Sequence, residues 1–165
     1  MDYDYLDTPI GSLLLVADEQ GLCRIDFPRA QQGDRIQSNW RRDRRYLGAA
    51  VAQLQAYFEG RLHAFDLVLA ARGTQFRKVV WNELARIPYA QTISYGELAR
   101  RIGAPAASRA VGAANGANPL PIVVPCHRVI GANGTLTGFG GGLPIKQWLL
   151  DHERRHTPHA TFALG

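Results

Sequence analysis

A cysteine and a histidine stand next to each other in the apolar stretch IVVPCHRVI, residues 122–130. A thiolate is a strong nucleophile, but a free cysteine has a pKa near about 8.5 and burial raises that pKa further. A base or a positive charge beside the thiol is therefore needed, and His127 and Arg128 are the nearest candidates. The arrangement indicates nucleophilic chemistry at the sulfur of Cys126, although a structural thiol beside a hydrogen-bonded histidine fits the same residues equally well.

The histidine needs two further features before it can act as a base on Cys126. Neighbouring side chains in an extended segment point to opposite faces, so a turn or a bridging water must bring the imidazole to the thiol. A catalytic imidazole is also oriented by a third group, usually a carboxylate. Beyond residue 72 the chain offers only Glu83, Glu97, Asp151 and Glu153, and Glu97 is expected in a helix cap.

The first part of the chain predicts a small sheet with one helix. Residues 1–27 alternate like β-strands, with turn residues at 7–12 and 18–21. Apolar residues at helical spacing predict a helix over 47–58, and alternation predicts a short strand over 65–69. The arginine-rich segment 29–45 is predicted to be a loop with some helix, without an assigned role.

The second part predicts helices around the cysteine stretch. Thr74 caps a helix that ends at Pro88, and Ser94 with Glu97 forms a capping box for a helix to about Ile102. Gly103 ends that helix, and Pro105 is expected in the first turn of a helix over 106–115. Helix, short turn and helix is the spacing of a helix-turn-helix. Its second helix consists mostly of small residues, which also suits a helix packed tightly in a core.

Three further segments complete the prediction for this second part. Residues 122–124 are expected to form a buried strand or extended run, and six of the twelve residues in 131–142 are glycine. Such a backbone can come close to a ligand. Pro144 is expected to open a last helix that runs through Glu153.

Composition and charge restrict the class of protein. The chain of 165 residues is 46% hydrophobic and 20% charged, which is typical of a globular protein, and no apolar run approaches the length of a membrane span. Two cysteines form neither a disulfide framework nor a zinc site. Residues 72–109 carry seven basic and two acidic side chains, which favours a polyanionic partner such as nucleic acid, with a solvated helix surface as the alternative.

Several motifs together resemble one known family. They are YGELA at 95–99, RAVG at 109–112, NP at 118–119, PCHRV at 125–129 and GGGLPIKQWLLDHE at 140–153. They resemble the O6-alkylguanine-DNA alkyltransferases, the methylated-DNA–protein-cysteine methyltransferases, strongly over residues 74–155 and only in layout over 1–71. The resemblance implies an α/β (α+β) fold with two domains. Residues 1–72 would form an N-terminal, RNase H-like structural domain with a small antiparallel sheet and a helix, and residues 73–165 a mostly helical domain that binds DNA and accepts the alkyl group.

The resemblance also implies roles for individual residues. Cys126 would attack the alkyl carbon on guanine O6 and keep the alkyl group as a thioether, so that each molecule acts once. His127 would take the thiol proton through a water, and Glu153 would orient His127. Tyr95 would donate a proton toward the departing guanine, and Arg109 would enter the base stack after the target nucleotide flips out.

DNA contact and the base pocket are assigned by the same resemblance. The helix-turn-helix would lie in the minor groove, whereas the motif alone would predict the major groove. Asn118 would tie the second helix to the cysteine segment. The expected DNA-binding residues are Tyr95, Ala107, Ser108, Arg109, Ala110 and Asn115, and the expected pocket and structural residues are Asn118, Pro125, Arg128, Val129, Gly138, Phe139, Gly140 and Gly141.

The remaining expectations concern substrates and partners. The partner would be double-stranded DNA containing O6-alkylguanine, and O4-alkylthymine is a second expected substrate. No cofactor, metal or membrane is expected, and the protein is expected to be a cytoplasmic monomer. Phe139 and Gly140 stand where relatives carry tyrosine and serine, so a roomier pocket that accepts alkyl groups larger than methyl is expected.

Three other classes of protein remain as alternatives. A lesion-marking protein of the same fold would lack the acceptor cysteine, which is present here as Cys126. A sequence-specific helix-turn-helix regulator would need long side chains on its second helix, which offers only Ser108, Arg109 and Asn115. A cysteine–histidine hydrolase would not need the basic helix-turn-helix.

Overall fold

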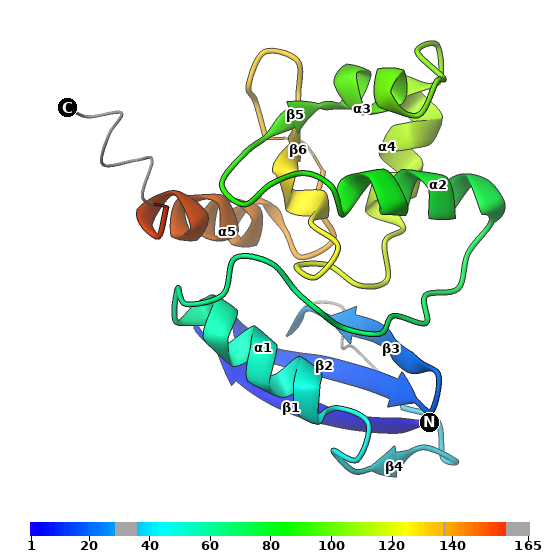
Figure 1. Cartoon of the computed structure of the whole chain (residues 1–165), viewed down its shortest axis with the longest axis vertical. Helices are drawn as coiled ribbons and strands as arrows, with labels where there is room; N and C mark the ends of the chain where they lie inside the picture. Colours follow the sequence, from blue (N-terminus) through cyan, green and yellow to red (C-terminus); the bar gives the residue numbers. More distant parts are fainter. Residues whose placement is uncertain (29–35, 137, 158–165) are drawn as a thin grey trace. The chain divides into compact units, whose positions relative to one another are not determined.

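The computed structural model describes residues 1–28, 36–136 and 138–157, and it divides into two compact units, Met1–Arg72 and Gly73–Gly165. The first unit is a sheet with one helix, and the second is mostly helical, so the mixed α/β class expected from the sequence is confirmed (Figure 1).

The first unit is built on a sheet of four strands with the order β3-β2-β1-β4. The strands are β1 (Asp2–Thr8), β2 (Gly11–Asp18), β3 (Gly21–Asp26) and β4 (Arg41–Arg42). β1, β2 and β3 pair antiparallel, and β4 pairs parallel with β1. Helix α1 (Gly48–Phe58) covers one face of this sheet (Figure 1). Residues 13–17 of β2 are all buried, so the central strand forms the middle of the core.

The arginine-rich segment differs from its prediction. Within its described part, residues 36–45, the structure forms strand β4 and no helix, while residues 29–35 lie outside the described part of the chain. Backbone hydrogen bonds from Arg41 N to Met1 O (2.9 Å) and from Asp43 N to Tyr3 O (3.1 Å) pair this segment with β1. Arg41 and Arg45 also form ion pairs with Asp2, and Arg42 and Arg44 form ion pairs with Asp4. Both aspartates belong to β1, so the ion pairs hold the segment on the edge of the sheet.

The predicted strand over 65–69 is also wrong. Only one isolated bridge forms, between Leu22 and Leu69, supported by hydrogen bonds from Leu22 N to Val68 O (2.9 Å) and from Ala70 N to Leu22 O (2.8 Å). The backbone of Asp66 is instead bound by the side-chain amide of Gln53 on α1, at 2.8 and 2.9 Å. Since a side chain has taken these backbone groups, they are not available for a ladder.

The second unit contains four helices, a short turn of 3₁₀ helix and two short strands among its described residues. Its elements are α2 (Gln75–Leu84), β5 (Ile93–Ser94), α3 (Tyr95–Arg101), α4 (Ser108–Gly116), the 3₁₀ turn η2 (Cys126–Arg128), β6 (Val129–Ile130) and α5 (Leu143–Arg155). Thr74 and Ser94 cap α2 and α3 as predicted, accepting from Arg77 N and Glu97 N. The Glu97 carboxylate instead accepts hydrogen bonds from Arg100 and Arg101.

The small-residue helix is shorter than predicted and is held from outside. It begins at Ser108, so Pro105 lies in the preceding turn and not in the first turn of α4. The indole of Trp81 on α2 donates a buried hydrogen bond to the carbonyl of Ala114, at 2.8 Å. Two glycines in a helix of nine residues make α4 weak by itself. The Trp81 bond and the packing of α4 against α2 and α3 therefore stabilise it.

Residues 122–124 form a turn, so the predicted strand is wrong. Ile122 has a φ of 74°, which is rare for a β-branched residue. The backbone closes on itself, with bonds from Val124 N to Leu120 O (2.9 Å) and from Cys126 N to Val124 O (2.8 Å). Pro121 and Pro125 on either side have no N–H for a ladder. This compact turn leads directly into η2 (Cys126–Arg128).

Candidate active site

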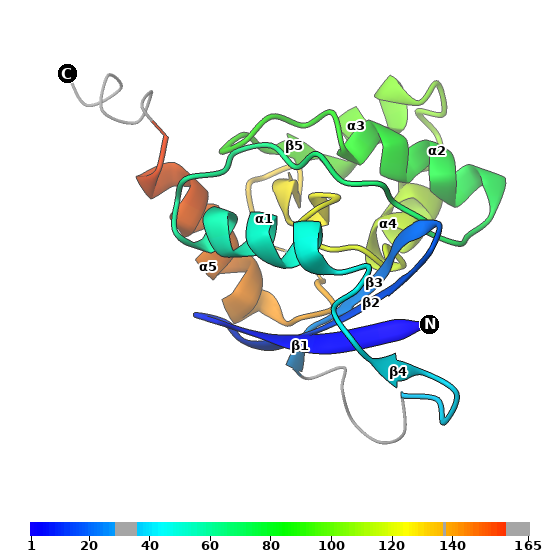
Figure 2. The same ribbon diagram turned by 60° about the horizontal axis from the view of Figure 1, so that its bottom comes forward.

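The cysteine, histidine and arginine of the predicted site lie together in η2. In the second unit this turn lies between α4 and α5 (Figures 1 and 2). Cys126 is 5% exposed, His127 0% and Arg128 5%. Because the segment is a 3₁₀ turn, the opposite-face argument for an extended chain does not apply to these neighbours.

One buried carboxylate organises the site. Glu153 on α5 is 0% exposed, and its Oε2 lies 2.6 Å from His127 Nε2. Arg128 donates to both oxygens, from Nε at 2.9 Å and from Nη2 at 3.0 Å, and Ala90 N donates to Oε1 at 3.1 Å. Burial alone would raise the pKa of Glu153, but the hydrogen bonds and charges of His127 and Arg128 hold it well below the usual range. Glu153 is therefore ionised at neutral pH.

Arg128 also connects this carboxylate to the loop after α2. Its Nη1 donates to Ile87 O at 2.7 Å, and its guanidinium lies 5.6 Å from the ring centroid of Tyr89. Ala90, whose N–H reaches Glu153, has a φ of 62°, a conformation that is costly for a residue other than glycine. The bond to Glu153 offsets part of that strain. No sequence signal indicated this loop, because its contribution is made by backbone atoms.

His127 is held as a neutral base. Burial lowers its pKa, Glu153 opposes that effect, and the nearby charges of Arg128 and Lys146 lower it further. An ionised carboxylate only accepts hydrogen bonds, so the proton of the neutral ring lies on Nε2, toward Glu153. Nδ1 is buried and has no hydrogen-bond partner among the described residues. The lone pair of Nδ1 is thus the one that can accept a proton.

The thiol of Cys126 stays protonated at neutral pH. Burial raises its pKa to about 11, while a hydrogen bond from Asn118 and the charge of Lys146 act in the opposite direction. Cys126 is therefore a protonated thiol in the resting site, and a thiolate forms only when a base removes the proton.

Lys146 is the residue that sequence reasoning missed. Its side chain is fully buried, and Nζ donates to Val129 O at 2.6 Å and lies 6.0 Å from the ring centroid of Phe139. Burial lowers the pKa of Lys146, and the charge of a Cys126 thiolate would raise it. A signal was present: Lys146 stands three, four and seven positions before Leu149, Leu150 and Glu153, so it shares their helix face.

Two asparagines at the end of α4 bind the cysteine segment. Asn118 Nδ2 donates to Val124 O at 2.8 Å, and its Oδ1 accepts from Leu120 N at 3.0 Å. Asn115 Nδ2 donates to Cys126 O at 3.4 Å, and this residue is only 3% exposed. Its side chain therefore points into the unit, whereas the resemblance placed Asn115 among the DNA-binding residues.

The other residues expected on the DNA side are more accessible. Ser108, Arg109 and Ala110 are exposed in the first turn of α4, directly after the half-buried Ala107. Tyr95, half-buried at the start of α3, lies against α4, since a Cβ on Gly112 would lie 3.8 Å from its ring. The structure thus places Tyr95 and Arg109 on two packed helices.

The glycine-rich loop reaches α5 through a tight turn. Gly142 N bonds to Phe139 O at 2.9 Å, and Gly142 has a φ of 93° at the start of α5. Gly138 and Gly140 are exposed, while Gly141 and Pro125 are buried. Phe139 is linked to the site through Lys146, as described above. Val129 is joined to the turn by its N–H, which donates to Cys126 O.

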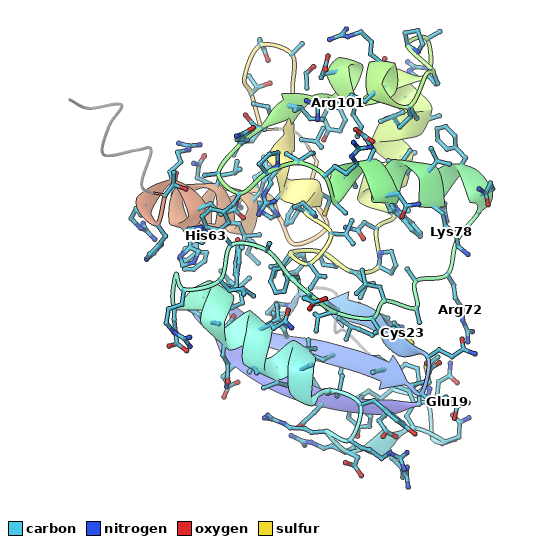
Figure 3. The ribbon with its side chains drawn as sticks, in the orientation of Figure 1. Glu19, Cys23, His63, Arg72, Lys78 and Arg101 are labelled. Carbon is cyan, nitrogen blue, oxygen red and sulfur yellow. The ribbon has the colours of Figure 1, made fainter. Side chains whose placement is uncertain are left out.

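Basic side chains lie on the helices around this site. Lys78 lies on α2 and Arg101 at the end of α3 (Figure 3). Glu97 binds Arg100 and Arg101, and Glu83 binds Arg86. Arg77, Lys78 and Arg109 form no ion pair with another described residue and are exposed. Their charge is available to an anionic partner.

The second free cysteine, Cys23, lies on β3 of the first unit (Figure 3), and burial raises its pKa. No group of three or more histidine, cysteine, aspartate or glutamate side chains is arranged to hold a metal ion among the described residues. No helix in the described ranges has the length and apolar character needed to span a membrane.

Two family models cover nearly the whole chain. Residues 1–71 match the ribonuclease-like domain of 6-O-methylguanine DNA methyltransferase, and residues 75–155 match its DNA-binding domain. Among curated proteins, the methylated-DNA–protein-cysteine methyltransferase of Methanosarcina acetivorans is 50% identical, over 93% of this chain and 98% of that protein. The protein of the same name from Mycolicibacterium paratuberculosis is 51% identical, over 96% and 95%.

Solved structures give the same result. The crystal structure of Mycobacterium tuberculosis OGT in complex with DNA superposes with a TM-score of 0.88 at 47% identity, covering 96% of each chain. The structure of Mycobacterium tuberculosis O6-methylguanine methyltransferase has a TM-score of 0.87 at 46% identity, covering 99% of each chain.

The carboxylate at the centre of the site gives a first prediction. Glu153→Gln keeps the shape but leaves the buried Arg128 without its counter-charge, which we expect to destabilise the protein by about 3–5 kcal/mol. Glu83→Gln is the matched control, because it removes an ion pair with an exposed arginine and should cost less than about 1 kcal/mol. Urea unfolding measures both. Equal losses for the two variants would contradict the central role of Glu153.

The thiol gives a second prediction, a loss of stability at alkaline pH. The pKa of Cys126 is raised to about 11, so between the pKa of a free thiol and this value the unfolded chain releases the proton and the folded chain keeps it. The free energy of unfolding should fall by roughly 2–3 kcal/mol over that interval. Cys126→Ala removes this contribution. Urea unfolding across the interval should therefore show a smaller loss for Cys126→Ala, and parallel curves would exclude a raised pKa.

Proposed function

The chain belongs to the methylated-DNA–protein-cysteine methyltransferase family, and we propose that it transfers the alkyl group of O6-alkylguanine in DNA to its own Cys126. Its relatives establish DNA repair by alkyl transfer as the activity, carried out once by each molecule. The acceptor, the proton path and the mode of base access are the proposal.

The observation that carries the proposal is the bond between His127 Nε2 and Glu153 at 2.6 Å. It leaves Nδ1 of a neutral, buried ring as the proton acceptor. In the first step the proton of the Cys126 thiol moves to Nδ1, through a bridging water. The resulting imidazolium lies against the ionised Glu153, which stabilises it as it forms.

In the second step the thiolate attacks the alkyl carbon. A sulfur–carbon bond forms while the carbon–O6 bond breaks, and the bonding electrons go to the guanine. Tyr95 donates its hydroxyl proton toward N3 of the departing base, which neutralises the leaving group. The thioether on Cys126 is stable, so no step in this sequence regenerates the thiol.

Lys146 supports the charged stage of this reaction. Its ammonium group is buried near Cys126, where water cannot screen its charge. A thiolate at Cys126 is therefore stabilised more strongly than it would be at the surface. This effect lowers the energy of the attacking species without converting the resting thiol to a thiolate.

The base reaches Cys126 by leaving the duplex. The alkyl carbon lies inside the stack, and unstacking costs a few kcal/mol. Ala107, Ser108 and Ala110 are small enough for α4 to enter a minor groove about 6 Å wide, and Arg109 fills the space left by the base. The same pocket would accept O4-alkylthymine. Arg77 and Lys78 supply contacts to phosphates, so binding should weaken with salt.

Intact-protein mass spectrometry tests the acceptor directly. After mixing with a short duplex containing O6-methylguanine, the wild-type protein should gain one methyl group, mapped by peptide analysis to Cys126. Cys126→Ala should gain none, while Cys23→Ala, the matched control, should gain one. Retained DNA binding without any gain by the wild-type protein would refute the transfer and favour a lesion-marking protein.

Pocket size gives a further test, which depends on Phe139 and Gly140. Neither residue places a hydroxyl group at the pocket, and Gly140 has no neighbour within 4 Å of a built Cβ. We expect the protein to accept a benzyl group as well as methyl. Phe139→Tyr with Gly140→Ser should lower the benzyl rate by about tenfold, because a smaller, more polar pocket loses apolar contact, and should change the methyl rate less. Single-turnover rates on matched oligonucleotides measure this, and a wild-type benzyl rate near zero would exclude the wider pocket.

A further inference from the structure

Helix α4 has two ends with different surroundings. Its first turn is exposed and presents Ser108, Arg109 and Ala110, whereas Ala114 and Asn115 at its other end are 2% and 3% exposed. Ala113 and Gly116 stay exposed, so α4 buries one face, and this single helix joins the exposed first turn to the buried Ala114 and Asn115.

The buried end of α4 is bonded to the backbone of the nucleophile. Asn115 Nδ2 donates to Cys126 O at 3.4 Å, and the same carbonyl also accepts the N–H of Val129. The carbonyl would therefore be satisfied without Asn115. The bond from the Asn115 amide is therefore an additional one, and it links α4 to the backbone of Cys126.

Stability also gives no reason for an amide at this position. Asn115 Oδ1 is buried and has no hydrogen-bond partner among the described residues. Such a group costs free energy, and an apolar side chain of similar size would avoid the cost. The amide therefore fits a role in positioning better than a role in holding the core together.

We propose that Asn115 is a positioning residue that couples α4 to Cys126, so that docking of α4 on DNA sets the position of the thiol for attack. The inference rests on the proposed function and extends it. Asn118 holds the neighbouring carbonyl of Val124 at 2.8 Å, so the cysteine segment is bound to the end of α4 on both sides of Pro125. Asn118 also reaches the thiol of Cys126, whereas Asn115 binds the backbone carbonyl of the reacting residue.

Two substrates with the same alkyl group separate coupling from simple support of the pocket. O6-methylguanine in a duplex engages α4, whereas O6-methylguanine as the free base enters the pocket without it. We measure the single-turnover rate of methylation at Cys126 with both, by intact-protein mass spectrometry. The ratio of the duplex rate to the free-base rate is the readout, because general damage to the pocket lowers both rates together.

Asn115→Leu removes the amide at similar volume, and we expect it to lower this ratio by about fivefold to tenfold. Asn115→Ser also loses the bond and should also lower the ratio. It replaces Asn115→Leu in the experiment if the leucine variant does not fold. Asn82→Leu is the matched control, since Asn82 is exposed on α2, and it should leave the ratio unchanged. Urea unfolding of each variant verifies the fold.

The outcomes distinguish this inference from the proposed function. If the wild-type protein gains no methyl group at Cys126 from either substrate, the proposed function fails and the coupling fails with it. If the wild-type protein is methylated but Asn115→Leu or Asn115→Ser leaves the ratio of the two rates as it was, the proposed function stands and the coupling is overturned.

Discussion

The ionised carboxylate of Glu153 in the interior of the second unit is the constraint on which the candidate site depends. A buried charge is tolerated only when it is paired and hydrogen-bonded, and Glu153 obtains three partners from two segments. Arg128 and His127 come from η2, and the N–H of Ala90 comes from the loop after α2. The shape of that loop, the tautomer of His127 and the register of α5 against η2 all follow from this one requirement.

The interior also contains more positive than negative groups. Arg128 and Lys146 are basic and buried, and Glu153 is the one buried carboxylate among the described residues of this site. While Cys126 is a thiol, the positive charge is in excess. Transfer of the thiol proton to His127 creates a thiolate and an imidazolium. The thiolate is then the counter-charge of Lys146, and Glu153 is the counter-charge of the imidazolium. Under the proposed mechanism, charge separation in the site is therefore balanced by groups already in place.

The sequence predicted the elements that depend on local signals. The Thr74 and Ser94 caps, the helix that starts beside Pro144 and the three antiparallel strands are visible as short patterns of residue types. Two of the errors lie where residues distant in the sequence meet. The Gln53 side chain binds the backbone of Asp66 where a strand was predicted, and the arginine-rich segment pairs with β1, whose Asp2 and Asp4 bind its arginine side chains. For the site, spacing marked Cys126 and His127 and the resemblance marked Glu153. Helical spacing could have placed Lys146 on the buried face of α5, but the contact of Asn115 with Cys126 O forms only when the helices pack.

A raised thiol pKa suits a protein that acts once. Nucleophilicity of a thiolate falls as its pKa falls, so a thiol with a high pKa gives a more reactive thiolate when a base removes its proton. The resting, protonated thiol meanwhile resists oxidation, which follows thiolate character and exposure. An enzyme with many turnovers can lose a fraction of its reactive cysteines, but here every modified Cys126 would end one molecule's activity. Burial of Cys126 at 5% exposure keeps the resting thiol protonated, and the proposed base, His127, follows it directly in η2.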